Sequence, residues 1–431
     1  MNDQTSEDMQ INWAIPLQHK LYLAAKRSAN RRFGILMDKV TRLDFLWEAW
    51  RRVKQKRGAA GVDHESIGMV EEYGEERFVL ELQALLKSEE YTASAIRRVY
   101  IPKDNGSQRP LGIPVVKDRV AQMAVKLVIE PLFESDFIDH SYGFRPKRSN
   151  QQAAQRVHRL LNRRKWAVLI DLKGYFDTIP HDRLLDLLRQ RVSDRRVIHL
   201  IRQWLKASVF EAGEYQPTTS GAPQGGVLSP LLSNIYLHEF DRQWDSFHGE
   251  VVRFADDIII LCWNSSQAED ALRRACALLE SLGLTVNRAK TCMVHARDGF
   301  DFLGFRYKEA WSHHCNRKVR IKFPRPKALK KARQRIKERI SSVPLGEPLH
   351  VVIKKANATL RGWANYFRIG NSSQAGYELA RYTCDQLRLW WRRHKNRKRI
   401  RGTRRWPNSF FYNRGLLYVP SLLNTSKNAT R

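Results

Sequence analysis

Short apolar runs alternate with longer amphipathic stretches through the middle of the chain. Segments 98–102 and 109–114 are rich in β-branched, aromatic and proline residues and flank a polar loop with Gly106, which predicts a hairpin that carries cations. The run 166–171 is apolar up to its last residue, as expected of a buried strand. Residues 118–133 have apolar positions at helical spacing and predict an amphipathic helix. Predicted hairpins and helices within one chain favour an α+β fold.

Two adjacent acids interrupt the most apolar part of this pattern. Asp256 and Asp257 stand between Val251-Val252 and the run 258–261, so we expect a hairpin whose tip presents both carboxylates. By itself, such a pair is more often a polar turn. Asp171, which ends the earlier apolar run, is a third acid, although a simple strand-end cap is an equally good interpretation of it. Three carboxylates on neighbouring strands suit divalent cations, which take oxygen ligands.

The segment after the two acids completes a recognisable order of elements. Ser266-x-x-Glu269 has the spacing of a capping box and predicts a helix start, and Gly283 suits the end of that helix. Segments 284–287 and 302–305 predict two short strands. The order β-α-β-β-α-β is that of a split βαβ sheet with helices behind it.

Near both ends of the chain, apolar residues recur at the spacing of a helix. The predicted helical regions are 1–57, 62–93, 327–340, 349–367 and 374–396.

The charge of the chain is concentrated near its C-terminus. Net charge is +32, and residues 316–431 hold 30 Lys+Arg against 4 Asp+Glu, whereas residues 1–315 hold 46 against 40. A basic excess of this density indicates a polyanionic partner. Aromatic residues interleave with the basic ones, among them Trp390, Trp391 and Phe410, which favours a folded nucleic-acid surface over a disordered tail.

Cysteine spacing and hydropathy exclude several classes of protein. The 5 cysteines form no CxxC pair, which argues against a zinc finger or a disulfide framework. No stretch is long and apolar enough for a membrane span, and the acidic start resembles no targeting signal. We therefore expect a cytoplasmic protein with no membrane partner.

Seven blocks, in order, resemble those of reverse transcriptases, in particular the class encoded by group II introns. They are YIPK (100–103) with RPLGIP (109–114), YGFRP (142–146), LIDLKGYFDTI (169–179), GAPQGGVLSP (221–230), RFADDI (253–258), GLTVNRAK (283–290) and FLGF (302–305). Beyond them, LRGWANYF (360–367) resembles the maturase-specific domain of that family.

The resemblance implies a right-hand polymerase with fingers, a palm built on the split βαβ sheet and a helical thumb, followed by an α-helical maturase domain. It divides the chain into an N-terminal basic helical extension (1–60), fingers and palm (61–310), a thumb-like basic region (316–348) and a maturase-specific RNA-binding domain (349–431). The implied enzyme is an RNA-directed DNA polymerase that extends a primer 3′-hydroxyl with dNTPs.

Site residues carry over from the family position by position. The metal site implied is Asp171, Asp256 and Asp257 with the carbonyl of Leu172, holding two Mg²⁺ ions, with Mn²⁺ as a substitute. Other implied contacts are Lys103, Arg109, Phe176 and Gln224 for the dNTP, with Phe176 selecting against ribonucleotides, and Phe254 and Lys290 for primer and template.

The C-terminal region implies a ribonucleoprotein with group II intron RNA, besides an RNA template and a DNA or RNA primer. Expected RNA-binding residues are Arg361, Trp363, Arg392, Arg393, Lys395, Arg397, Lys398 and Arg399. This implies a bacterial protein associated with RNA and the nucleoid.

Two departures from the family pattern leave alternatives open. Phe254 stands where the family usually has Tyr, which removes a hydroxyl near the primer end. No Cys/His ligand set follows the maturase segment, so we expect no endonuclease domain. The alternatives are a domesticated or stand-alone reverse transcriptase in repair or defence, and a non-catalytic RNA-binding splicing factor. The intact acidic triad argues against the last.

Overall fold

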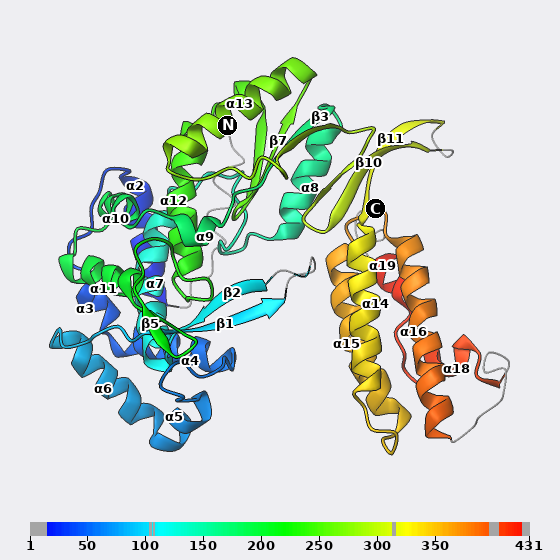
Figure 1. Ribbon diagram of the computed structural model, residues 1–431, viewed down its shortest axis with the longest axis horizontal. Helices are drawn as coiled ribbons and strands as arrows, with labels where there is room; N and C mark the ends of the chain where they lie inside the picture. Colours follow the sequence, from blue (N-terminus) through cyan, green and yellow to red (C-terminus); the bar gives the residue numbers. More distant parts are fainter. Residues whose placement is uncertain (1–14, 103–105, 107, 313–315, 396–404, 425–431) are drawn as a thin grey trace. The chain divides into compact units, whose positions relative to one another are not determined.

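The computed structural model describes residues 15–102, 106, 108–312, 316–395 and 405–424. The chain divides into two units, which interleave along the sequence: residues 1–149, 169–260 and 269–292 form the first, and 150–168, 261–268 and 293–431 the second. The division into four consecutive domains stays a prediction. Figure 1 shows the order of the elements by colour.

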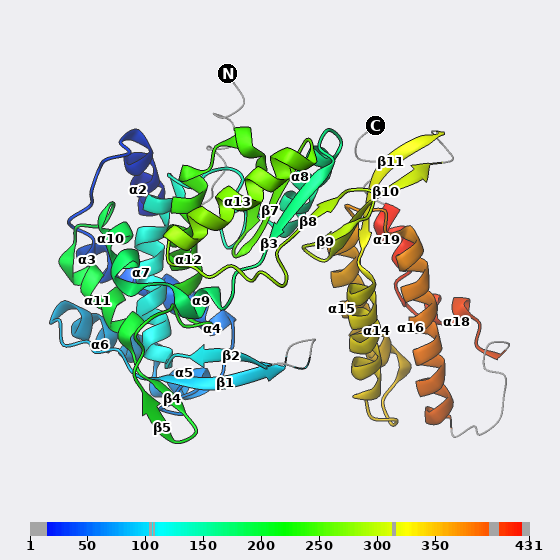
Figure 2. The ribbon, with the colours of Figure 1, turned by 45° about the horizontal axis from the view of Figure 1, so that its top comes forward.

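The predicted cationic hairpin lies in the first unit and is confirmed. Strands β1 (Ile96–Pro102) and β2 (Gln108–Ile113) pair antiparallel, with Ile101 opposite Arg109. Two short strands, β4 (Val209–Glu211) and β5 (Glu214–Gln216), extend this sheet in the order β2-β1-β4-β5 (Figure 2).

The predicted split βαβ arrangement appears as a four-stranded sheet in the order β6-β7-β3-β8. Its strands are β6 (Glu250–Phe254), β7 (Asp257–Cys262), β3 (Trp166–Ile170) and β8 (Cys292–His295). Since β7 lies beside β3, the order brings the strand that precedes Asp171 next to the hairpin of the two other acids. The strand expected at 284–287 is reduced to a single antiparallel bridge between Leu172 and Val286.

The first unit also contains a set of helices. They are α2 (Pro16–Arg27), α3 (Met37–Val40), α4 (Leu43–Gln55), α5 (Ile67–Tyr73), α6 (Glu75–Lys87), α7 (Val116–Glu134), α9 (Tyr175–Thr178), α10 (His181–Arg189), α11 (Arg195–Lys206), α12 (Ser229–Gln243), most of α13 (Ser265–Ser281) and the 3₁₀ turn η1 (Ser246–His248).

Helix α7 corrects one expectation. It was predicted to be amphipathic, but nearly all of its side chains are buried, because α2, α3, α4 and α12 pack around it. Its polar side chains are therefore interior groups with partners. Arg119, for example, donates through Nε to the carbonyl of Pro114 at 2.9 Å.

The start of α13 differs from the predicted capping box. Asn264, not Ser266, accepts a hydrogen bond from the backbone of Gln267 at 2.8 Å, and Gln267 Oε1 accepts one from the backbone of Trp263 at 2.8 Å. The helix begins earlier because this reciprocal pair satisfies its first amides. Gly283, with φ of 75°, ends the segment as predicted.

The second unit combines a small sheet with a bundle of helices. The sheet order is β11-β10-β9, with β9 (Phe300–Phe302), β10 (Phe305–Ser312) and β11 (Arg317–Pro324). Residues 302–305 are not a strand. Leu303 and Gly304 have φ of 45° and 78° and form the tight turn between β9 and β10.

The helices of the second unit confirm the C-terminal predictions. They are α8 (Asn150–Leu161), α14 (Pro326–Ser341), α15 (Leu349–Phe367), α16 (Ser373–His394), α18 (Asn408–Tyr412) and α19 (Val419–Asn424). Helices α14, α15 and α16 pack side by side, as Figures 1 and 2 both show, and α19 contacts α15 and α16. Among the described residues, none of the helices has the length and apolarity needed to cross a membrane.

Candidate active site

The three predicted acids stand at neighbouring strand ends of the first unit. Asp171 directly follows β3, Asp256 lies in the two-residue turn between β6 and β7, and Asp257 is the first residue of β7. Asp171 and Asp256 are half-buried, whereas Asp257 is exposed. Ala255, the other residue of the turn, has φ of 56°, in the left-handed region.

Asp171 is held by the segment that follows α13. Asn287 Nδ2 donates to Asp171 Oδ2 at 2.8 Å, and the backbone amide of Asn287 donates to the Asp171 carbonyl at the same distance. Thr291 Oγ1 accepts from the Asp171 amide at 3.2 Å. Lys290 Nζ lies 3.4 Å from Asp171 Oδ2, so the structure joins two predicted site residues that are far apart in sequence. Sequence reasoning missed Asn287, although it lies in the block that carries Lys290.

Burial makes the charged form of the Asp256 carboxyl costly. Burial raises the pKa of the Asp256 carboxyl, and the nearby charge of Asp171 adds to that rise. A hydrogen bond from its own backbone and the charges of Arg109 and Arg253 oppose the shift without cancelling it. A bound cation would relieve this cost.

The donor chemistry fits a hard divalent cation. Among the described residues, no three His, Cys, Asp or Glu side chains converge closely enough to form a metal cluster by themselves. The three acids nevertheless offer only oxygen ligands, the kind that Mg²⁺ prefers. The ammonium group of Lys290 already places one positive charge against the Asp171 carboxylate.

Hydrogen bonds join the segment of Phe176 to the loop of Gln224 in the first unit. Phe176 is half-exposed on α9, and its carbonyl accepts a hydrogen bond from the Ala222 amide at 2.7 Å. Gln224 Nε2 donates to Asp177 Oδ2 at 3.3 Å. Tyr175 connects α9 to α12, because its buried hydroxyl donates to the carbonyl of Ser233 at 2.7 Å.

The loop of Gln224 is also tied to the cationic hairpin. The amide of Gly112 on β2 donates to the Gln224 carbonyl at 2.6 Å, and a Cβ on Gly225 would lie 2.5 Å from the Gly112 carbonyl oxygen. Arg109 stands on the same strand and is exposed. Lys103 lies outside the described residues.

A pocket of 310 Å³ opens between this hairpin and the loop. It is lined by parts of β1, β2 and β4, by residues 216–223 and by Phe176 and Asp177. Its lining thus includes Phe176, the residue expected to contact the nucleotide sugar.

Phe254, the departure from the family pattern, faces a second phenylalanine. Its ring centroid lies 6.3 Å from that of Phe144, which is 48% exposed and has φ of 58°. The block YGFRP therefore reaches the catalytic turn through Phe144.

The predicted RNA-binding residues divide into surface and interior groups. Arg361, Arg393 and Lys395 are exposed and Arg392 is half-buried, with Lys395 Nζ 4.8 Å from the centroid of the Trp391 ring. Trp363 is only 7% exposed and packs in the helical bundle, so we leave it out of the RNA surface. Arg397, Lys398 and Arg399 lie outside the described residues.

One basic pocket was not anticipated. It has a volume of 370 Å³ and lies in the first unit, where α10 and α11 meet the segment before α3. Its charged lining residues are Arg32, Arg189, Arg195 and Arg202. The sequence signal is the seven-residue spacing of Arg195 and Arg202, which places both on one face of a helix.

Comparisons with known proteins agree with this architecture. The family model for reverse transcriptase (RNA-dependent DNA polymerase) matches residues 101–307, and the model for the group II intron maturase-specific domain matches 329–406. The chain is therefore a reverse transcriptase joined to a maturase domain. It belongs to the group II intron reverse transcriptase/maturase family.

Individual relatives support the same assignment. Protein YkfC of Escherichia coli strain K12 is 36% identical over 358 residues, covering 72% of this chain and 93% of YkfC. The group II intron-encoded protein LtrA of Lactococcus lactis is 39% identical over 205 residues, covering 47% of this chain but 33% of LtrA. A 91 kDa protein in the cob intron of Schizosaccharomyces pombe is 29% identical, covering 65% and 44%. The chain is an RNA-directed DNA polymerase of the divalent-metal-dependent kind.

Proposed function

We propose that this polymerase copies RNA by extending a primer 3′-hydroxyl with dNTPs at a site of two Mg²⁺ ions held by Asp171, Asp256, Asp257 and the Leu172 carbonyl. The observation that carries the proposal is the placement of the acids at adjoining strand ends, with the Asp171 charge contributing to the raised pKa of Asp256. When bound, the ions lower the pKa of the attacking hydroxyl and stabilise an in-line displacement. Mn²⁺ is the expected substitute.

The remaining residues of the site position the substrates. Arg109, with Lys103, grips the triphosphate, and the planar fork of the guanidinium suits phosphate oxygens. Phe176 lies under the sugar and excludes a 2′-hydroxyl. Gln224 contacts the nucleotide, and Lys290 and Phe254 stand at the primer end.

The maturase domain directs the enzyme to group II intron RNA, where the proposed role is to assist splicing and mobility. Support comes from exposed Arg361, Arg393 and Lys395 on the helices of the second unit. The four-arginine pocket adds an anion-binding surface on the first unit. A bacterial cytoplasmic ribonucleoprotein is the setting we propose.

Replacement of one carboxylate tests the catalytic part. Asp256→Ala should abolish primer extension on an RNA template while intron RNA binding stays within about twofold of wild type, because these sites are separate. Asp182→Ala, which removes an exposed acid on α10, serves as the control and should extend normally. Normal extension by Asp256→Ala would contradict the metal-site assignment.

A further inference from the structure

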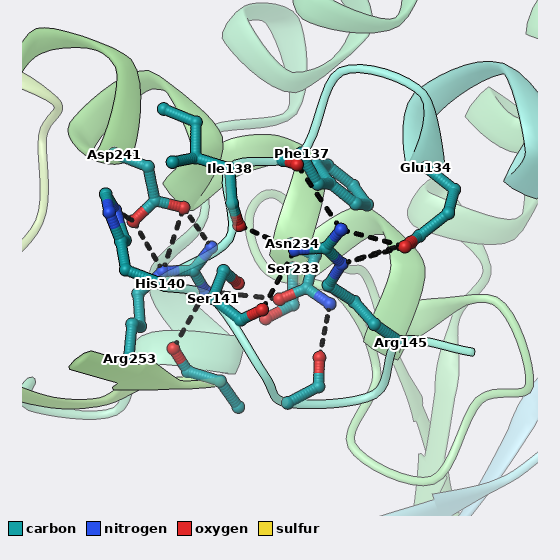
Figure 3. Close-up of polar contacts among 12 residues, drawn as sticks. Glu134, Phe137, Ile138, His140, Ser141, Arg145, Ser233, Asn234, Asp241 and Arg253 are labelled. Atoms are coloured by element: carbon teal, nitrogen blue, oxygen red, sulfur yellow. Dashed lines mark hydrogen bonds and ion pairs between the residues drawn. The ribbon is translucent and has the colours of Figure 1, made fainter. Parts of the chain in front are cut away.

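A fully buried arginine lies directly behind the catalytic turn. Arg253, on β6, has no exposed surface, and its guanidinium forms a two-pronged ion pair with Asp241 of α12 (Figure 3). Nε lies 2.8 Å from Asp241 Oδ1, and Nη2 contacts the other carboxylate oxygen. The pair fixes the plane of the guanidinium group.

The remaining arm of that guanidinium reaches the turn itself. Nη1 donates to the Ala255 carbonyl at 3.0 Å and to Asn234 Oδ1 at 3.1 Å. Ala255 is the left-handed residue that immediately precedes Asp256. A non-glycine residue holds this conformation only where its surroundings over-determine it. The hydrogen bond from Arg253 supplies part of that constraint.

Asn234 extends the support to a second segment. Its Nδ2 donates to the Gly143 carbonyl at 2.7 Å. Gly143 touches the other side of the turn, since a Cβ there would lie 2.2 Å from the Ala255 nitrogen. Residues 140–142 follow β6 closely, because Arg253 donates its amide to the His140 carbonyl and accepts from the Tyr142 amide, both at 2.8 Å.

The ion pair favours the charged form of the Asp241 carboxyl. Burial alone would raise the pKa of Asp241, but the charge and hydrogen bonds of Arg253, helped by His140, hold that pKa well below its usual range. Arg253 therefore acts as a fixed donor whose charge is balanced locally.

We propose that Arg253 is a positioning residue of the polymerase site, which holds the Ala255–Asp256 turn so that the Asp256 carboxylate faces Asp171 for metal binding. This inference rests on the metal-site part of the proposed function. A stabilising role alone would not need this residue, because buried ion pairs often add little over apolar packing. The guanidinium pairs with Asp241 through Nε and Nη2 while a third nitrogen, Nη1, donates to the turn, a spread that the single nitrogen of a lysine does not match.

Arg253→Lys tests the proposal, because it keeps the charge but loses the fork. Mn²⁺ binding is measured by electron paramagnetic resonance in the complex with an RNA template, a dideoxy-terminated DNA primer and dNTP. We expect Mn²⁺ affinity to fall roughly tenfold, as for other residues that orient metal ligands. The Mg²⁺ concentration for half-maximal extension should rise by a similar factor, with the KM for dNTP nearly unchanged.

Arg191→Lys is the matched control. Arg191 is also a buried arginine paired with an aspartate, Nε lying 2.6 Å from Asp136 Oδ2, but its other donors go to carbonyls of the α2 end and the segment after it. The Arg191→Lys variant should have a lower midpoint of thermal unfolding but a Mn²⁺ affinity within about twofold of wild type. If folded Arg253→Lys behaves in the same way, the positioning role is overturned.

Asn234→Ala keeps the proposal testable if Arg253→Lys does not fold. It leaves the ion pair in place but removes the Asn234 acceptor that holds Arg253 Nη1 beside the Ala255 carbonyl, together with the link to Gly143, so a smaller loss of about threefold is expected. Wild-type Mn²⁺ affinity in this variant would then overturn the proposal. Asp256→Asn is the reference for a lost ligand. If the wild-type protein binds Mn²⁺ no better than Asp256→Asn does, the metal site itself is contradicted. If Asp256→Asn weakens Mn²⁺ binding but Arg253→Lys does not, only the positioning role of Arg253 is contradicted.

Discussion

The ammonium group of Lys290 lies 3.4 Å from Asp171 Oδ2, on the first carboxylate of the proposed catalytic triad. The two side chains are 65% and 36% exposed, so solvent screens the pair and the attraction is modest. In the absence of metal, the lysine partly neutralises the carboxylate. We propose that, with metal bound, the same ammonium group contacts a phosphate of the primer.

Lys290→Gln should therefore separate metal binding from primer binding. Without the competing ammonium group, the affinity of the free protein for Mn²⁺ should rise by about threefold, in line with a screened surface pair. The KM for primer–template should also rise, because a phosphate contact is lost. Mn²⁺ titration and steady-state extension measure the two effects, with exposed Lys206→Gln on α11 as the control. A lower Mn²⁺ affinity in Lys290→Gln would contradict this interpretation.

Phe176 offers a test of sugar selection. Phe176→Val keeps an apolar side chain but removes the ring, so ribonucleotides should be incorporated more readily. The ratio of kcat/KM for dCTP over CTP should fall by at least ~10-fold, the scale of discrimination by steric fit. Tyr215→Ala, which removes an aromatic that is 66% exposed on β5, should leave the ratio unchanged. If Phe176→Val loses stability but keeps its selectivity, the ring is only a packing residue against Tyr175, whose ring centroid is 5.4 Å away.

Local patterns in the sequence predicted most of the elements that build the site. The β1–β2 hairpin, the strand before Asp171 and the turn at Asp256 follow from short apolar runs and their polar ends. The three long C-terminal helices follow from apolar periodicity. These features depend on neighbouring residues, which a sequence displays directly.

What was missed depends on contacts between distant segments. Helix α7 looked amphipathic because its polar residues have helical spacing, but other helices enclose it and satisfy those groups. The Arg253–Asp241 pair and the Asn287–Asp171 hydrogen bond join residues from different elements. Trp363 was assigned to RNA from the resemblance of its segment to the maturase domain, yet its side chain is buried. Residue type alone does not indicate which neighbour the fold will supply.

A buried carboxyl in the first unit predicts a defined pH dependence of stability. Burial raises the pKa of Asp118 to about 6, against hydrogen bonds from the Tyr91 hydroxyl at 2.6 Å and the Ser94 amide at 2.9 Å. The folded state thus holds a proton that the unfolded chain releases at lower pH. This contribution is fully present below about pH 4 and is lost as pH rises through about 6.

Asp118→Asn should remove that dependence. From pH 4 to 7, the difference in unfolding free energy between variant and wild type should shift in favour of the variant by on the order of 1–3 kcal/mol. Urea denaturation of both proteins across this range measures it, since the other titrating groups cancel in the difference. The exposed acid variant Asp182→Asn should track wild type. A constant difference between Asp118→Asn and wild type would show that the carboxyl does not titrate in this window.

The two basic surfaces make separate predictions for RNA binding. Each Lys or Arg that contacts a phosphate releases counterions, so its loss reduces the salt dependence of the binding constant. Arg195→Ser with Arg202→Ser, in the four-arginine pocket, should weaken binding of a labelled group II intron RNA and lower the slope of log K against log salt by about 1.5. Arg392→Ser with Arg393→Ser should act similarly on the second unit.

The matched control removes the same charge elsewhere. Lys87→Ser with Lys206→Ser, at exposed positions outside the pocket, should change the slope by less than about 0.5 if the pocket is the RNA site. Fluorescence anisotropy over a range of KCl concentrations gives the slope, and primer extension on a short RNA template checks that catalysis survives. An arginine-pocket variant whose slope matches the control would show that this pocket lies off the RNA path. If both arginine variants change the slope while extension is normal, intron RNA is held on each unit at surfaces separate from the catalytic residues.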